Sequence, residues 1–161
     1  MNADAFRHFY NYHFAENRKL WETYIPLLTQ EQFTRDLGYS LGSVRNQLVH
    51  LMSVDDTWFS GLRGVEIPEP LNPAHFENRD DIRSYWDNVE RSMVAYLEGL
   101  RDDMLFDKPL QDEDKALVLW QVLLHVVNHG TDHRAQILCM LNKLGVKTAS
   151  QDYIFFVYEN P

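Results

Sequence analysis

The sequence holds a single cysteine, Cys139, in 161 residues, so no disulfide can form within the chain. It has only 7 glycines and 6 prolines, too few for an all-β fold with a turn about every ten residues. Basic residues are also scarce, with 15 lysines and arginines against 24 acidic residues and a formal charge of −9. Phosphate binding needs clustered basic side chains, so we expect no nucleic-acid partner.

The sequence also lacks a long apolar run. Its longest nearly apolar stretch, 116–127, is interrupted by Gln121 and has His125 near its end. A membrane span needs about 20 apolar residues, so we expect no membrane-spanning helix. The first residues show no basic start followed by an apolar segment, which argues against a signal peptide. With the lone cysteine, these features lead us to expect a cytoplasmic protein.

What the chain does have is apolar residues, 45% of the total, with 13% aromatics. A chain of this length and composition is expected to fold as one domain, residues 1–161, around its own core. Apolar side chains recur at three- and four-residue steps in several long segments, a pattern typical of amphipathic helices. The periodicity predicts four long helices, over residues 3–28, 43–62, 80–100 and 115–144.

The connections between these segments differ in length. Thr29 and Gln32 have capping-box spacing and predict a short helix within 29–37, and Pro26 should tighten or end the first helix. The proline-rich segment 65–78 predicts a long extended crossover between the second and third helices. The aromatic tail, 153–158, fits either a short helix or an extended strap. No segment favours a strand, so we predict an all-α four-helix bundle.

The last predicted helix carries His125, His129 and His133, spaced at four residues. At about 100° per residue these side chains lie along one stripe, each about 6 Å from the next. Two imidazoles four residues apart can bind one divalent ion together. Apolar residues surround the stripe, so we expect it to face the core, and we expect Cys139 to be buried as a small apolar residue.

A metal site would need a further ligand from another helix. His50 on the second helix is the best candidate, and His13 on the first is the runner-up; His8 and His75 are expected at the surface or in loops. Buried histidines can also be plain core residues with satisfied hydrogen bonds. On spacing alone, a metal site and a metal-free bundle with core histidines both remain open.

The absence of several known motifs argues against three kinds of functional site. Gly130 follows His129, so the general-base glutamate of HExxH zinc peptidases is absent. No Glu-x-x-His pair lies on a predicted helix, which argues against a di-iron carboxylate bundle. The glycine-rich loops that bind nucleotide phosphates are absent as well.

Two segments together resemble the DinB family, the damage-inducible four-helix proteins. Residues 123–137, LLHVVNHGTDHRAQI, resemble the last-helix signature of that family. The second helix matches a histidine-acid-tryptophan pattern of the family with His50, Asp55 and Trp58. Asn17 and the tail residues 152–154 also fit, so the resemblance spans nearly the whole chain. It implies an up-down-down-up bundle, in many members a homodimer.

The resemblance further implies a metal, typically nickel or zinc, held by three histidines. By position these are His50, His129 and His133, while His125 would be a neighbour of the site. Ala135 and Asp132 depart from the common family residues, but neither is an expected ligand, and we expect Asp132 to be a solvated surface acid. Four further residues are candidates for contacts with the metal ligands or for lining a pocket beside the metal: His125, His13, Trp58 and Gln121.

Three neutral imidazoles leave a divalent ion with at least one open position, as in catalytic sites. Some relatives of the family are transferases that use low-molecular-weight thiols, and others are hydrolases, while many have no known activity. We therefore expect a divalent-metal-binding protein that acts as a metal-dependent thiol S-transferase on a small-molecule substrate. The alternatives are a non-catalytic metal-binding stress-response protein and a metal-dependent hydrolase.

Overall fold

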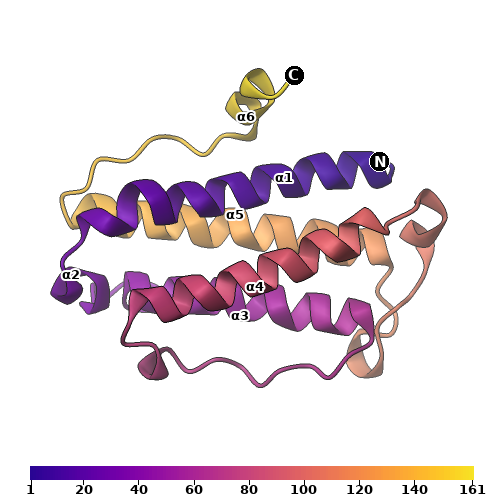
Figure 1. The fold of residues 1–161 in the computed structure, drawn as a ribbon, viewed down its shortest axis with the longest axis horizontal. Coiled ribbons are helices and arrows are strands. Elements are labelled where there is room, and N and C mark those ends of the chain that lie inside the picture. Colours follow the sequence, from indigo (N-terminus) through magenta and orange to yellow (C-terminus); the bar gives the residue numbers. More distant parts are fainter.

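The computed structural model describes residues 1–161, and every regular element in it is a helix. Four long helices lie side by side (Figure 1). They are α1 (Ala3–Lys19), α3 (Val44–Arg63), α4 (Arg79–Glu98) and α5 (Leu119–Lys143). Two short helices, α2 (Gln30–Thr34) and α6 (Tyr153–Glu159), flank them. The predicted all-α class is confirmed, and none of these helices has an apolar stretch long enough to cross a lipid bilayer.

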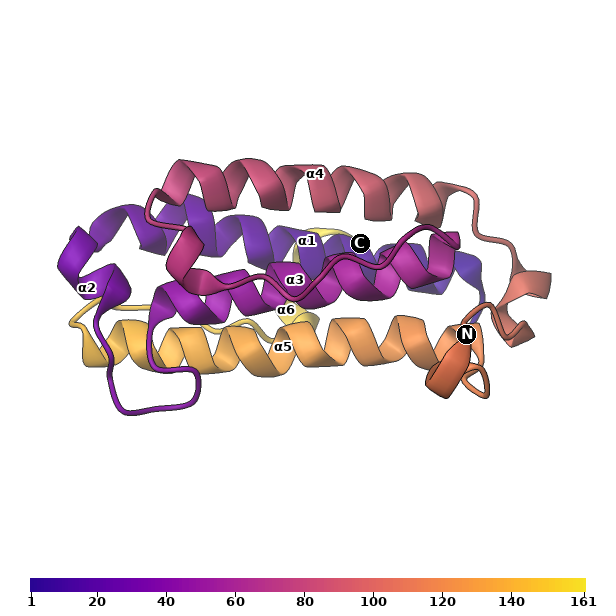
Figure 2. The same ribbon diagram turned by 90° about the horizontal axis from the view of Figure 1, so that it is seen from below.

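The proline-rich segment between α3 and α4 runs back along the whole length of the helices (Figure 2). Its only regular element is a 3-10 turn, Pro73–His75. As a result α3 and α4 point the same way, and α5 runs opposite to both (Figure 1). Helix α3 contacts both α4 and α5, and α1 contacts the same two helices. The arrangement places α3 alongside α5.

Side-chain caps fix where several helices begin. The predicted capping box of α2 is present: the Gln32 backbone N–H donates to Thr29 Oγ1 at 3.1 Å, and the Thr29 N–H donates to Gln32 Oε1 at 2.9 Å. The Ser43 hydroxyl accepts from the Asn46 N–H at 3.2 Å and starts α3. At its other end, α3 stops at Gly64, whose φ of 64° is the left-handed conformation that glycine adopts without strain.

The first helix is shorter than its apolar periodicity predicts. Instead of one helix over 3–28, α1 ends at Lys19 and continues as a π-helical turn, Leu20–Tyr24, and a 3-10 turn, Ile25–Leu27. Pro26 has no N–H to donate, and its ring crowds the preceding turn. The regular backbone hydrogen bonds of an α-helix therefore cannot continue through this segment, although its apolar residues keep their helical spacing.

The last helix also begins later than predicted, at Leu119 instead of residue 115. The acidic residues Asp112–Asp114 form a separate 3-10 turn. Val118 is extended, and its N–H donates to Gln121 Oε1 at 2.9 Å. Gln121 is exposed and caps α5 with its carboxamide oxygen. These acidic residues therefore precede α5 and are not part of it.

Buried apolar side chains from all four long helices form one continuous core. Leu48, Leu51 and Met52 of α3 and Val126, Val127 and Ile137 of α5 belong to this core and are fully buried. The expectation that Cys139 is buried is wrong, because it is exposed on the outward side of α5. The tail forms the short helix α6, so of the two predicted alternatives the helical one is correct.

Helices α1 and α5 approach closely at Gly130. A Cβ atom built on Gly130 would lie 2.6 Å from His13 Nδ1 and would also overlap the neighbouring ring carbon, Cε1. His13 itself is completely buried. The missing side chain at Gly130 is therefore what lets the His13 ring lie directly against α5.

The substitution Gly130→Ala tests this contact. Overpacking should lower the free energy of unfolding by about 1–3 kcal/mol, in spite of the ~1 kcal/mol by which alanine favours a helix over glycine. Urea denaturation measures the change. Gly99→Ala is the matched control, because a Cβ there meets only Tyr96 O at 3.5 Å. A Gly130→Ala protein as stable as the wild type would show that the close approach is not a constraint.

Candidate metal centre

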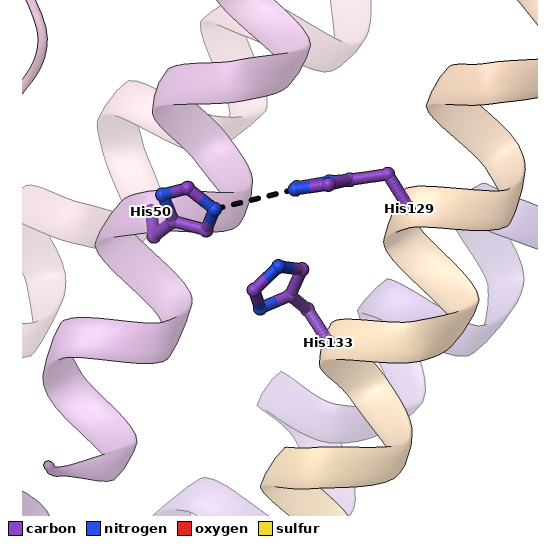
Figure 3. Close-up of side chains that lie close together, drawn as sticks. All are labelled: His50, His129 and His133. Carbon is purple, nitrogen blue, oxygen red and sulfur yellow. Dashed lines mark hydrogen bonds between the residues drawn. The ribbon is translucent and has the colours of Figure 1, made fainter. Parts of the chain in front are cut away.

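Three histidine side chains point toward one another between α3 and α5 (Figure 3). His50 comes from α3, and His129 and His133 come from consecutive turns of α5. One ring nitrogen of each lies within 4.8 Å of the others, and the Nε2 atoms of His50 and His129 are 3.2 Å apart. These are the three residues that the family resemblance implies as ligands, and the cluster could hold a metal ion.

The backbone geometry accounts for this convergence. His129 and His133 are four residues apart, and their ring centroids are separated by 4.3 Å. The His50 ring lies 4.6 Å from that of His133 and 5.2 Å from that of His129. All three side chains are half-buried. The cluster therefore lies at the edge of the α3–α5 contact, where solvent can reach it.

A buried glutamine fixes the orientation of one of the three rings. His133 Nδ1 lies 2.7 Å from Gln47 Oε1, and since a carboxamide oxygen only accepts, Nδ1 carries the proton and donates it. The Gln47 carboxamide nitrogen in turn donates to Ser40 Oγ and Gln136 Oε1. This leaves His133 Nε2 with a free lone pair, the arrangement usual for histidines that bind metals. The sequence analysis missed this role of Gln47, although its place three residues before His50 offered a signal.

The surroundings keep the cluster unprotonated. Burial, and then the neighbouring His133 and His50, lower the pKa of His129 from 6.5 to about 3. The pKa of His50 is lowered by burial and by His133, with Asp55 opposing. Burial also lowers the pKa of His133, against the opposing charge of Asp132. All three imidazoles are therefore neutral at pH 7.

This donor set fits a divalent ion of the first transition row. Neutral imidazole nitrogens suit zinc, nickel, copper and iron, and no carboxylate or thiolate joins the three histidines in the cluster. His129 Nδ1 is buried and has no hydrogen-bond partner. Unlike His133, His129 therefore has no partner that fixes which of its ring nitrogens carries the proton.

The runner-up ligand, His13, lies outside the cluster and belongs to a buried polar network. Arg134 Nη1 donates to His13 Nδ1 at 3.1 Å, and His13 Nε2 lies 3.3 Å from Asp55 Oδ2 and 3.1 Å from Asn17 Nδ2. Burial lowers the pKa of His13, with Asp55 opposing. Arg134 also donates to Asn17 Oδ1 at 3.0 Å. With both ring nitrogens engaged, His13 has no lone pair left for a metal.

Arg134 itself was missed by the sequence analysis. It is only 1% exposed and Asp55 is fully buried, although charged residues are rarely buried unless they are paired. Asn17 and Asp55 were noticed through the family resemblance, but nothing in the spacing links them to Arg134. The network joins α1, α3 and α5 directly beside the cluster.

His125, the third member of the α5 stripe, is exposed, and so is Gln121. The prediction that the whole stripe faces the core is therefore wrong. Each step of four residues turns the side chain by about 40°, and the step from His129 to His125 carries the ring out from between the helices. The ring packs edge-on against Trp58, with centroids 5.2 Å apart, and lies 5.9 Å from that of His129.

The structure also places Asp132 of α5 and the two histidines that were expected at the surface or in loops, His8 and His75. Asp132 is exposed and accepts a hydrogen bond from Gln136, as expected for a solvated acid. His75 is exposed on the crossover, but His8 is half-buried and packs against Tyr153 and Phe156 of α6. The aromatic tail thus covers part of α1.

Comparison with known proteins agrees with this geometry. The model of the DinB family matches residues 1–160. Protein DinB of Bacillus subtilis (strain 168) is 25% identical over 167 residues, which cover 98% of this chain and 96% of that protein. The match includes both helices that carry the three histidines. The chain therefore belongs to the DinB family.

Proposed function

We propose that this protein binds one divalent metal ion, nickel or zinc, through His50, His129 and His133. The observation that carries the proposal is the convergence of three neutral imidazoles from two helices within 4.8 Å. Imidazole alone does not select one metal, since selectivity depends on geometry and supply. Nickel and zinc are the metals that the family resemblance favours.

We further infer that α1, α3, α4 and α5 form the up-down-down-up bundle of the family within a single domain. The crossover that returns along the length of the helices supports this order (Figure 2). The resemblance also supports a homodimer. The cluster draws its ligands from one chain, so metal binding does not depend on that dimer.

Three protein ligands leave part of the coordination sphere of the metal open. Catalytic zinc sites have this composition, whereas structural sites are closed by four protein ligands. The half-buried position of the three rings is consistent with access for a small molecule. A divalent cation bound here would act as a Lewis acid and would lower the pKa of a thiol or water in the open position.

Gln47 and Asp55 favour metal binding at the cluster in two different ways. Gln47 holds the His133 ring in the tautomer that presents Nε2. Asp55 places a buried carboxylate close enough to raise the pKa of His50 against the effect of burial, so its charge also favours a cation in the cluster. Asp55 Oδ1 has no hydrogen-bond partner, so that oxygen is not neutralised by a local donor.

For the reaction, we propose transfer of a low-molecular-weight thiol to an electrophilic small molecule. The thiol loses its proton to solvent, its sulfur forms the new bond to carbon, and the leaving group departs with the electron pair of the bond that breaks. The cluster contains no carboxylate that could serve as a general base for water, which favours a nucleophile that ionises readily, such as a thiol. His50, His129 and His133 would hold the metal, and His125, whose ring lies 5.9 Å from that of His129 and 5.2 Å from that of Trp58, would lie nearby. Hydrolysis and metal binding without turnover are the competing functions.

Replacing single histidines tests the ligand set. The wild type should bind one zinc or nickel ion per chain by elemental analysis and calorimetry. His50→Ala, His129→Ala and His133→Ala should each weaken binding by more than the roughly 10–100-fold that loss of an outer-shell partner costs. His125→Ala should weaken it only slightly. The control is His75→Ala, on the exposed crossover, and equal losses in His125→Ala and His129→Ala would refute the assignment.

Metal affinity should also depend on pH, because protons and the cation compete for the same nitrogens. The pKa of His129 is lowered to about 3, and the pKa values of His50 and His133 are lowered as well. A lower pKa means fewer protons to displace, so affinity should stay flat through the ordinary histidine value of about 6.5 and should fall only at a lower pH, where His50 and His133 begin to take up protons. Calorimetric titrations between about pH 8 and pH 5 measure this. A steep loss that begins above pH 7 would argue against these three ligands.

The proposed reaction is tested by incubating the metal-loaded protein with a panel of thiols and electrophiles. Conjugates should form above background and should disappear in the His129→Ala protein. If no thiol gives a conjugate but an ester or amide is cleaved, the protein is a hydrolase. If neither reaction occurs while the metal remains bound, the protein binds a metal without catalysing either reaction.

A further inference from the structure

A pocket of about 620 Å³ lies beside the metal cluster, on the other side of His125. Its walls come from α1, from the first half of α5 and from the segment that leads into α6. Pockets that bind small molecules commonly have volumes of roughly 300–1,000 Å³. His50, His129 and His133 do not line it, so it is a site distinct from the cluster.

Aromatic rings form one side of this pocket. Phe9 and Tyr12 of α1 lie nearly parallel, with centroids 6.0 Å apart and an interplanar angle of 8°. Tyr153 packs edge-on against both, at 5.3 Å from each, and Trp120 of α5 also lines the pocket. Such surfaces favour a flat, apolar or aromatic ligand, which gains both burial and ring-to-ring contacts.

Unpaired polar groups form the α5 side. His125 and Asn128 line the pocket, and neither side chain makes a hydrogen bond with another residue. Gln121, one turn before His125, uses its carboxamide oxygen for the helix cap, so its NH₂ group remains available. The three side chains recur at helical spacing along one face. They offer donors and acceptors to a ligand that lies against the aromatic rings.

The tail wall of the pocket is fastened to the bundle. The Tyr12 hydroxyl donates to the Gln151 carbonyl oxygen at 2.6 Å. The Gln151 carboxamide donates to Thr131 O at 3.1 Å and accepts from Arg134 Nε at 3.0 Å. These bonds tie the segment before α6 to both α1 and α5. The pocket is therefore preformed and does not depend on a loose terminus.

The charges around the pocket exclude one class of ligand. No lysine or arginine lines it, and its only carboxylate is that of Asp152. Arg134 lies behind the wall but is only 1% exposed. Its Nε and Nη groups are engaged by Gln151, His13 and Thr131. A phosphorylated or otherwise anionic ligand would therefore find no counter-charge here.

We propose that this pocket binds a neutral aromatic small molecule that carries at least one hydrogen-bonding group. The ring lies against Phe9, Tyr12 and Tyr153, and the polar group faces His125 and Asn128. The His125 ring is 5.9 Å from that of His129, so His125 is a neighbour of both the pocket and the cluster. Assigning this ligand as the acceptor in thiol transfer rests on the proposed function, whereas binding itself does not.

Calorimetry on the metal-free protein tests the proposal with naphthol and naphthyl phosphate as a neutral and an anionic probe. Naphthol should bind at least tenfold more tightly than naphthyl phosphate. Asn128→Phe should weaken naphthol binding at least tenfold, because the new ring fills the pocket from an exposed position of α5. Ala135→Phe is the matched control, since it adds the same ring to an exposed position of the same helix outside the pocket.

The proposal is overturned if naphthol does not bind, if naphthyl phosphate binds as tightly, or if Asn128→Phe and Ala135→Phe weaken binding equally. Circular dichroism checks that both variants fold. Should Asn128→Phe not fold, the comparison of the two probes on the wild type decides the question. Because no metal is present in these titrations, a failure of naphthol to bind would leave the metal-binding proposal intact. Likewise, a failure of the protein to bind a metal would leave the pocket proposal intact.

Discussion

Three imidazole rings that meet within 4.8 Å can coexist only if they stay largely unprotonated. In this protein burial and mutual repulsion enforce that condition, most strongly for His129, whose pKa falls to about 3. A neutral imidazole keeps one N–H and offers one lone pair, and the contact of α3 with α5 brings one ring nitrogen of each histidine to within 4.8 Å of the others. The packing of these two helices thus produces a cluster of three histidines that could hold a metal ion.

The neighbouring network of Asp55, His13 and Arg134 is a second consequence of this architecture. Burying charges costs desolvation free energy that hydrogen bonds only partly return, so an apolar core would hold three helices together as well. What the polar network adds is a fixed geometry, since each bond specifies how α1 sits on α3 and α5. Gly130 takes part in this by admitting the His13 ring. The same network places a carboxylate beside His50, which links the packing of α1 to the electrostatics of the cluster.

The sequence could predict features that depend on one helix at a time. The spacing of His129 and His133, and the capping box at Thr29, follow from local geometry and agree with the structure. Features that depend on how helices sit against each other could not be predicted. The exposure of His125 and Cys139 depends on the rotation of α5 about its axis, which its partners set. The contact between Gln47 and His133 depends in the same way on the register of α3 against α5, and periodicity does not encode register.

The central claim is that imidazoles from α3 and α5 ligate one metal ion whose coordination shell the protein leaves incomplete. X-ray absorption spectroscopy of the zinc- or nickel-loaded protein measures that shell directly. For zinc, the account predicts three imidazole nitrogens at about 2.0–2.1 Å. The remaining positions should hold atoms that are lighter than sulfur and do not come from the protein. A shell that contains sulfur, fewer imidazoles or a fourth protein ligand would contradict it.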